Sequence, residues 1–139
     1  MNKVLNLGVV ILLLFISACA TTQNSRIVEG GNQLALRNMQ TRAFDSTDQN
    51  LVVRNVIATL QDLSFVIDSA DADLGTVTAT KLSGYQIKIT VTVRKRNDTQ
   101  MLVRASAQYQ LKAIDDPKMY QSFFAALSKS LFLTAHQVE

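Results

Sequence analysis

Two stretches of the chain alternate between apolar and polar residues. From Tyr85 to Val93 the odd-numbered residues are apolar and the even-numbered ones polar, and a similar alternation runs from Met101 to Leu111. Because successive side chains of a strand point to opposite faces of a sheet, each stretch predicts a strand with one buried and one wet face. The polar segment 94–98 between them predicts a turn. We therefore expect a long antiparallel hairpin.

Two other segments show the spacing of amphipathic helices. After Ser46, apolar residues recur three and four positions apart as far as Leu63. Ser46 and Gln49 have the form of a capping box, which closes the first N–H groups of a helix over residues 47–61. The acidic pair and proline at 115–117 predict the start of a second helix. Its apolar face is formed by Tyr120, Phe123, Phe124, Leu127 and Leu131.

Shorter runs predict the remaining strands. Residues 63–67 and 76–80 are apolar or β-branched and are separated by the turn-forming segment 71–75, whereas residues 36–44 alternate only weakly. Two amphipathic helices and a few strands must bury their apolar sides on one another. The predicted fold is α+β, a two-layer sandwich in which an antiparallel sheet of three to four strands packs on two helices.

The first residues have the composition of an export signal. Residues 1–3 carry one positive charge, residues 7–16 form an unbroken apolar run, and Ser17 and Ala18 are small. A helix of about ten residues rises only about 15 Å, whereas the apolar core of a bilayer is about 30 Å thick. The pattern favours a cleaved signal peptide over a spanning helix.

The sequence Ile16-Ser17-Ala18-Cys19 resembles the lipobox of bacterial lipoproteins, and Cys19 is the single cysteine of the chain. The alternative is a plain signal peptide that ends at a chance cysteine. The resemblance implies cleavage before Cys19 and attachment of diacylglycerol and a third acyl chain to it, and several chains anchor a protein far more firmly than one. Ala20 follows in place of Asp. By resemblance to bacterial sorting rules, this implies an outer-membrane anchor with the domain facing the periplasm.

These features divide the chain into three parts. Residues 1–18 are the expected signal peptide, residues 19–33 the lipidated cysteine with a flexible tether, and residues 34–139 a single α+β domain. The tether prediction rests on the polar segment 20–25 and on the glycine pair 30–31.

Charge and cysteine content exclude several classes of function. The formal net charge is +3, of which Lys3 lies in the expected signal peptide. This excess is too small to favour a nucleic-acid partner. A single cysteine excludes a disulfide within the chain and a metal site built from several thiolates.

The order of helix, short strand, acidic turn, strand, long hairpin and helix resembles the helix-grip domains of BamC, a lipoprotein of the outer-membrane barrel-assembly machinery. The resemblance is carried by Leu60–Asp68 and Asp73–Val77 and extends over about residues 45–135. Two segments, Arg42–Asp48 and Asp116–Phe124, are similar to small proteobacterial lipoproteins of unassigned function. The resemblance implies a fold and a cellular address, and it brings no signature residue for an activity.

Two isolated features are candidates for chemistry. His136 is the sole histidine and lies three residues from the end of the sequence. A last-turn position favours a solvated residue over a base held against a nucleophile. Asp68, Asp71 and Asp73 lack the glycine and closing glutamate of a calcium loop, so we expect them to cap backbone N–H groups in a turn.

A mildly basic face is expected on the wet side of the hairpin. Its cations are Lys88, Arg94, Arg104 and Lys112, with Lys95 and Arg96 at the tip of the hairpin. One interpretation is that they keep an exposed sheet soluble. The other is a docking surface for an acidic protein partner or an anionic envelope component.

We therefore expect a non-enzymatic protein with no catalytic residue, metal or cofactor. The favoured function is a structural or accessory component of an outer-membrane assembly, secretion or efflux complex. The alternative is a periplasmic binding module for a small ligand or peptidoglycan, with a cleft between sheet and helices as its site.

Overall fold

The computed structural model describes residues 25–83 and 85–136, which form three helices and six strands. Their order along the chain is α2 (Ser25–Met39), β1 (Thr41–Asp45), α3 (Gln49–Asp62), β2 (Val66–Asp71), β3 (Thr76–Ser83), β4 (Tyr85–Lys95), β5 (Gln100–Tyr109), β6 (Lys112–Ala113) and α4 (Pro117–His136). The chain divides after Gln33 into two units, and the described residues of the first unit, 25–33, belong to α2.

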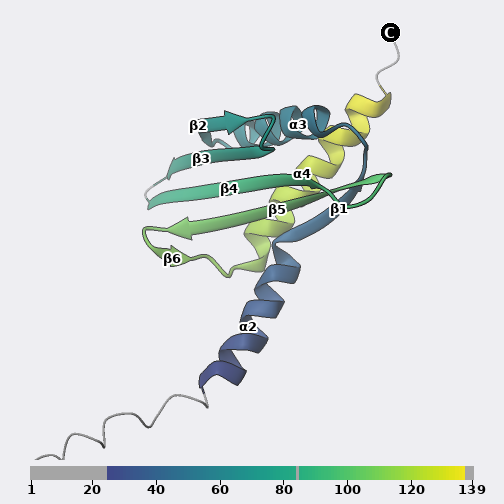
Figure 1. The fold of residues 1–139 in the computed structure, drawn as a ribbon. Coiled ribbons are helices and arrows are strands. Elements are labelled where there is room, and N and C mark those ends of the chain that lie inside the picture. Colours follow the sequence, from purple (N-terminus) through teal and green to yellow (C-terminus); the bar gives the residue numbers. More distant parts are fainter. Residues whose placement is uncertain (1–24, 84, 137–139) are drawn as a thin grey trace, which may run out of the picture. The chain divides into compact units, whose positions relative to one another are not determined.

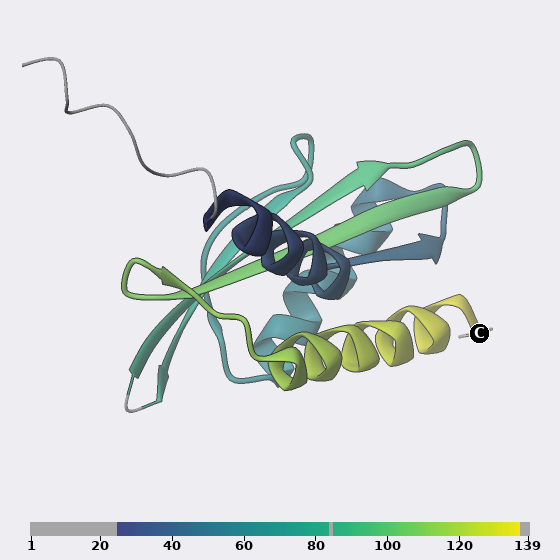
Figure 2. The same ribbon diagram turned by 90° about the horizontal axis from the view of Figure 1, so that it is seen from below.

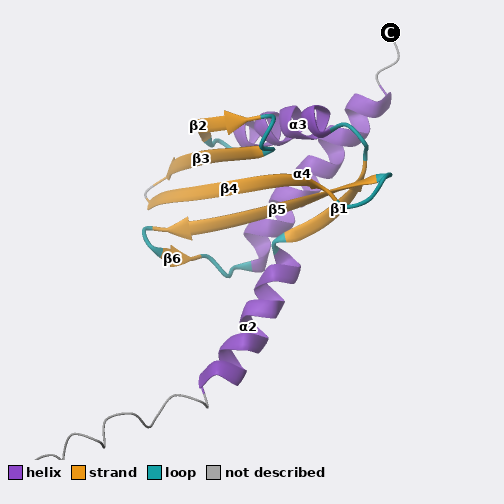
Figure 3. Cartoon of the chain, in the orientation of Figure 1, coloured by secondary structure: helices purple, strands orange, loops and turns teal. Residues whose placement is uncertain are grey.

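One antiparallel sheet organises the second unit. Its strand order is β1-β5-β4-β3-β2, and β6 also pairs with β5. Figures 1 and 3 show α3 and α4 on the same side of this sheet. The predicted α+β class is confirmed, but the sheet has more strands than the three to four expected. One strand that the sequence did not predict is β6, which is only two residues long and is therefore too short to show an alternating pattern.

The predicted hairpin is confirmed. β4 and β5 pair from Ile87 opposite Tyr109 to Lys95 opposite Met101. Odd-numbered side chains of both strands, from Ile89 to Val93 and from Met101 to Ala107, are exposed by 4% or less. The alternation ends earlier than the sequence indicates, because Gln110 adopts a left-handed conformation (φ 53°) and Leu111 is 97% exposed.

The helix expected over residues 47–61 is α3, but its cap differs from the prediction. The carboxylate of Asp48, not the hydroxyl of Ser46, accepts the Leu51 N–H at 2.9 Å. The Gln49 side chain donates to the carbonyls of Ala72 (2.9 Å) and Asp73 (3.1 Å) in the β2–β3 turn. The predicted capping box is therefore wrong. The charged carboxylate of Asp48 lies closer to the helix than Ser46, and the Gln49 amide bonds to the distant β2–β3 turn.

The strand expected over residues 36–44 is wrong in its first half. Residues 25–39 are helical, including the part of the expected tether from residue 25 onward, and only Thr41–Asp45 is a strand. The end of α2 is closed by Arg42, whose guanidinium donates to the Asn38 carbonyl at 2.9 Å. Leu36 and Met39 pack against the core. Their three-residue spacing fits a helix as well as the weak alternation fits a strand.

The core lies between the sheet and the two helices α3 and α4 (Figure 2). The expected apolar face of the last helix is confirmed, since Tyr120, Phe123, Phe124 and Leu127 are buried. The α4 cap is also as expected, with the Asp116 carboxylate accepting the Lys118 N–H at 3.0 Å. In the described part of the chain, all core residues lie between Leu36 and Leu131. A chain without residues 1–18 therefore keeps each of these residues.

One polar group is built into this core. The Tyr120 hydroxyl donates to the Ile114 carbonyl at 2.6 Å. It accepts from the Gln40 amide at 3.1 Å and from the Ala107 N–H at 3.3 Å. Tyr120 and Gln40 are exposed by only 1% and 3%. This hydroxyl joins Gln40 to the segment from Ala107 to Tyr120, and its hydrogen bonds satisfy a buried polar group.

Candidate functional site

The sheet has a covered face, packed on α3 and α4, and an open face on the other side. In the described residues the open face carries polar side chains at nearly every central position. Neighbouring strands are in register, so Thr76 lies beside Thr92 and Thr92 beside Arg104. The central members of the open face are Thr76, Thr78, Thr80, Lys88, Thr90, Thr92, Arg104, Ser106 and Gln108.

Two of the predicted cations lie on the open face without a local partner. Lys88 and Arg104 are exposed, and among the described residues neither makes a hydrogen bond or an ion pair. Arg104 pairs with Thr92, and Lys88 lies four residues from Thr92 along β4. At about 3.3 Å per residue, their rows are about 13 Å apart. The hydroxyls of Thr90 and Ser106 occupy the row between them.

Each of the three cations at the hairpin tip contacts an acceptor in the tip itself or in the neighbouring β2–β3 turn. Lys95 forms an ion pair with Asp98 at 2.8 Å, and Arg96 donates to the Gln100 side chain at 3.3 Å. The Arg94 guanidinium donates to the carbonyls of Leu74 and Val93. Arg94 thereby fastens the β2–β3 turn to β4. The tip cations therefore differ from Lys88 and Arg104, whose side chains have no local acceptor in the described part of the chain.

Lys95 pairs with Met101, which is buried on the covered side, so Lys95 does not project from the open face. Lys112 is also placed elsewhere. It pairs with Tyr109, and Tyr109 pairs with Ile87 on the covered side. Paired residues of adjacent strands project to the same face, so Lys112 does not belong to the open face. The prediction is wrong because the alternation was continued through the left-handed turn at Gln110.

Apolar side chains stand at one corner of the open face. Val66 is 68% exposed and pairs with Thr80, the neighbour of Lys88 across the sheet. Leu82, two residues beyond Thr80 on β3, is 78% exposed. Exposed apolar groups beside cations and hydroxyls are a combination found in protein-binding surfaces.

The aspartates of the β2–β3 region accept hydrogen bonds from neighbouring residues. The Asp71 carboxylate accepts the Leu74 N–H at 2.8 Å, which confirms the turn-capping interpretation for this residue. Asp68 instead accepts the Thr80 hydroxyl at 2.6 Å within the sheet. In the described part of the chain, no three His, Cys, Asp or Glu side chains form a group that could hold a metal ion.

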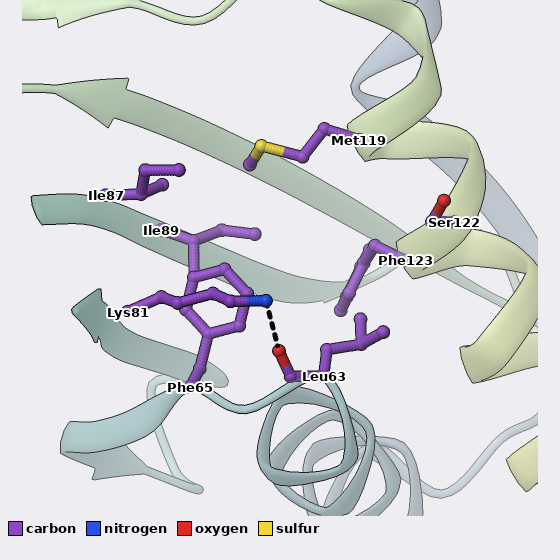
Figure 4. Close-up of a pocket in the computed structure, with 8 residues that line it drawn as sticks. All are labelled: Leu63, Phe65, Lys81, Ile87, Ile89, Met119, Ser122 and Phe123. Atoms are coloured by element: carbon purple, nitrogen blue, oxygen red, sulfur yellow. Dashed lines mark hydrogen bonds between the residues drawn. The ribbon is translucent and has the colours of Figure 1, made fainter. Parts of the chain in front are cut away.

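The covered face contains a pocket of about 250 Å³ at the end of the sheet near the β3–β4 connection. Its wall is apolar except for Lys81 and Ser122 (Figure 4). The lining residues are Leu63, Phe65, Lys81, Ile87, Ile89, Met119, Ser122 and Phe123. A concave apolar site with few polar groups is typical of small-molecule binding.

Lys81 owes its place in this wall to the geometry of β3. It is in phase with the buried Val77 and Ala79, so its stem starts on the covered face. Its ammonium donates to the Leu63 carbonyl at 2.9 Å and lies 5.6 Å from the centre of the Phe65 ring. Our sequence interpretation missed Lys81, although a lysine in phase with two apolar strand positions was the available signal.

The end of α3 shapes the other side of the pocket. The Phe65 N–H donates to the Leu60 carbonyl and the Ser64 N–H to the Gln61 carbonyl, both at 2.9 Å. This pair of bonds is the Schellman motif, and Ser64 takes the left-handed position (φ 66°) that it requires. The motif turns Phe65 into the core and leaves the Leu63 carbonyl for Lys81.

Other predicted site residues fall at the chain ends. Cys19 and the expected cleavage residues Ile16, Ser17 and Ala18 lie outside the described residues. His136 is the last residue of α4. Among residues 25–83 and 85–136, no helix combines the length and apolarity needed to cross a membrane.

Comparison with known proteins finds solved structures that are similar to this chain but no related sequence. No family model and no curated protein sequence matches the chain. The adenylate sensor from AMP-activated protein kinase, in complex with 5-aminoimidazole-4-carboxamide 1-beta-D-ribofuranotide, is similar to it with a TM-score of 0.48 and 11% sequence identity. The similarity covers 66% of this chain and 94% of the sensor. A likeness this weak carries no functional argument.

Proposed function

We propose that the protein is a non-enzymatic accessory component of an outer-membrane complex, anchored by lipids on Cys19, with its domain in the periplasm. The anchor is supported by the lipobox resemblance of residues 16–19 and by the absence of any other cysteine from the sequence. The proposed role of the domain is to bind an acidic protein partner through the open face of the sheet.

The observation that carries the partner proposal is the pair Lys88 and Arg104. Both are exposed on the open face, about 13 Å apart along the strands, and neither has a partner among the described residues. The tip cations differ because each has a local acceptor. Val66 and Leu82 add exposed apolar area beside Lys88, which favours a protein over a purely polar glycan.

The partner proposal is tested by photo-crosslinking in intact cells from a reactive residue at position 90, between the two cations. Replacing Lys88→Ser together with Arg104→Ser should lower recovery of the crosslinked partner about fivefold, since each exposed charge contributes about 0.5 kcal/mol. The matched control is Lys95→Ser with Arg96→Ser, which removes the same charge from the tip. Equal losses in both pairs, or no loss in the first, would contradict the proposal. Retention on purified cell wall would support the peptidoglycan alternative instead.

The anchor is tested separately by Cys19→Ser. The lipidated protein should stay with the membrane fraction and incorporate labelled palmitate. The Cys19→Ser protein should incorporate no palmitate, and its form of mature size should not stay with the membrane fraction. Normal membrane attachment of the Cys19→Ser protein would show that another element holds it there.

A further inference from the structure

The pocket on the covered face has a positive charge in its wall and no negative charge to balance it among the described residues that line it. Lys81 contributes a cation to its wall, and no Asp or Glu is among the lining residues. The ammonium has three N–H donors. One donates to the Leu63 carbonyl, and no other acceptor is found for it in the described part of the chain. A ligand that brings a negative oxygen into the pocket would satisfy the remaining donors.

The rest of the wall suits hydrocarbon. Ile89 and Phe123 are exposed by only 1% and 2% and form the inner part of the pocket, while Ile87 and Met119 are half-buried nearer its rim. Figure 4 shows Lys81 crossing the Phe65 ring with its nitrogen between Leu63 and the apolar side chains. The site therefore places one cation next to an apolar cavity.

The volume sets the size of a matching molecule. Pockets for drug-sized ligands measure about 300 Å³ or more, so 250 Å³ suits a smaller molecule. Octanoate, with about ten non-hydrogen atoms, has the right size, charge and apolar content.

We propose that this pocket binds a short amphiphilic carboxylate, with the carboxylate at the Lys81 ammonium and the hydrocarbon chain against Ile89 and Phe123. Lys81 is then a specificity-determining residue that selects an acid over the corresponding alcohol. The pocket lies on the opposite side of the sheet from Lys88 and Arg104. The ligand proposal consequently does not depend on the partner proposed for the open face.

The test uses residues 19–139 with Cys19→Ser, which include every core residue found in the described part of the chain. Octanoate and 1-octanol, below their aggregation limits, are titrated by calorimetry, and the bound site is located from amide chemical shifts. We expect octanoate to bind at least about tenfold more tightly than 1-octanol, because a hydrogen bond to a charged group is stronger than one between neutral groups. The largest shifts should fall on residues that line the pocket.

Three variants separate charge, shape and folding. Lys81→Met should weaken octanoate binding about tenfold and leave 1-octanol binding within about twofold. Lys88→Met, which removes a lysine from the other face, should change neither. Ser122→Trp places a large side chain at an exposed rim position and should reduce binding of both ligands. Equal binding of acid and alcohol, unchanged octanoate binding by Lys81→Met, or shifts away from the pocket would each overturn the proposal.

Discussion

The covered and open faces of the sheet share the same backbone but differ in how their polar groups are used. On the covered side the Tyr120 hydroxyl has three partners and the Lys81 ammonium caps the end of α3. On the open face, the side chains of Lys88 and Arg104 make no hydrogen bond or ion pair in the described part of the chain. The polar groups of the covered face therefore stabilise the fold, whereas the cations of the open face are available to bind a partner.

Arg94 and Lys81 are exceptions that sharpen this comparison. Arg94 starts on the open face but fastens the β2–β3 turn through the Leu74 carbonyl. Gly75 in that turn has φ +59°, and a Cβ there would approach the Val93 carbonyl to 2.4 Å. On the covered face, Lys81 leaves donors beside a cavity. A residue's face alone does not fix its role, and its contacts must be considered as well.

The largest difference between the faces is expected for the same substitution made on each. Leu127→Ala, at a fully buried position of α4, should lower the free energy of unfolding by about 3 kcal/mol through lost burial and a cavity. Leu82→Ala, at a 78% exposed position of the open face, should change it by less than about 0.5 kcal/mol. Urea unfolding followed by circular dichroism measures both. Similar values for the two would remove the energetic distinction between the faces.

An intermediate effect is expected for Tyr120→Phe. The substitution keeps the ring but removes the hydroxyl that bonds to Ile114, Gln40 and Ala107. Because these buried groups lose a partner, we expect a loss of about 2 kcal/mol. The control is Tyr109→Phe, whose residue is 37% exposed at the end of β5. Amide exchange at Ala107 should quicken in Tyr120→Phe; protection equal to that of the unaltered protein would mean that water replaces the hydroxyl.

The sequence was informative where a pattern is long and local. The β4–β5 hairpin and the apolar face of α4 each extend over many residues, so their periodicity survives single exceptions such as Leu102. It was less informative where a role depends on a distant contact. Gln49 belongs to the capping pattern in sequence but bonds to the β2–β3 turn, and Lys112 loses its expected phase after Gln110.

The candidate sites divide in the same way. Lys88 and Arg104 were predicted because alternation within one strand sets their face. The local partners of Lys95 and Arg96 were not, because ion pairs in a tip depend on how the turn closes. The pocket at Lys81 was missed altogether, since the α3–β2 connection, β3, β4 and α4 all contribute to its wall. The available sign of this pocket in the sequence was that Lys81 shares the strand alternation of the apolar residues Val77 and Ala79.

The smallest effects come from exchanging hydroxyl and methyl groups between neighbouring positions of β4. Val91→Thr has nearly the same shape but places a hydroxyl on the covered face, where Val91 is fully buried among apolar side chains. Without a partner, that hydroxyl should cost about 1.5 kcal/mol of unfolding free energy.

The reciprocal substitution, Thr92→Val, adds a methyl group in place of a half-exposed hydroxyl that makes no recorded hydrogen bond in the described part of the chain. Threonine and valine both favour strands, so the unfolding free energy should change by less than about 0.5 kcal/mol. Urea unfolding of the two single variants and of the double variant measures the asymmetry directly. If Thr92→Val proved as costly as Val91→Thr, the open-face hydroxyls would belong to the fold, and binding would have to rest on Lys88 and Arg104 alone.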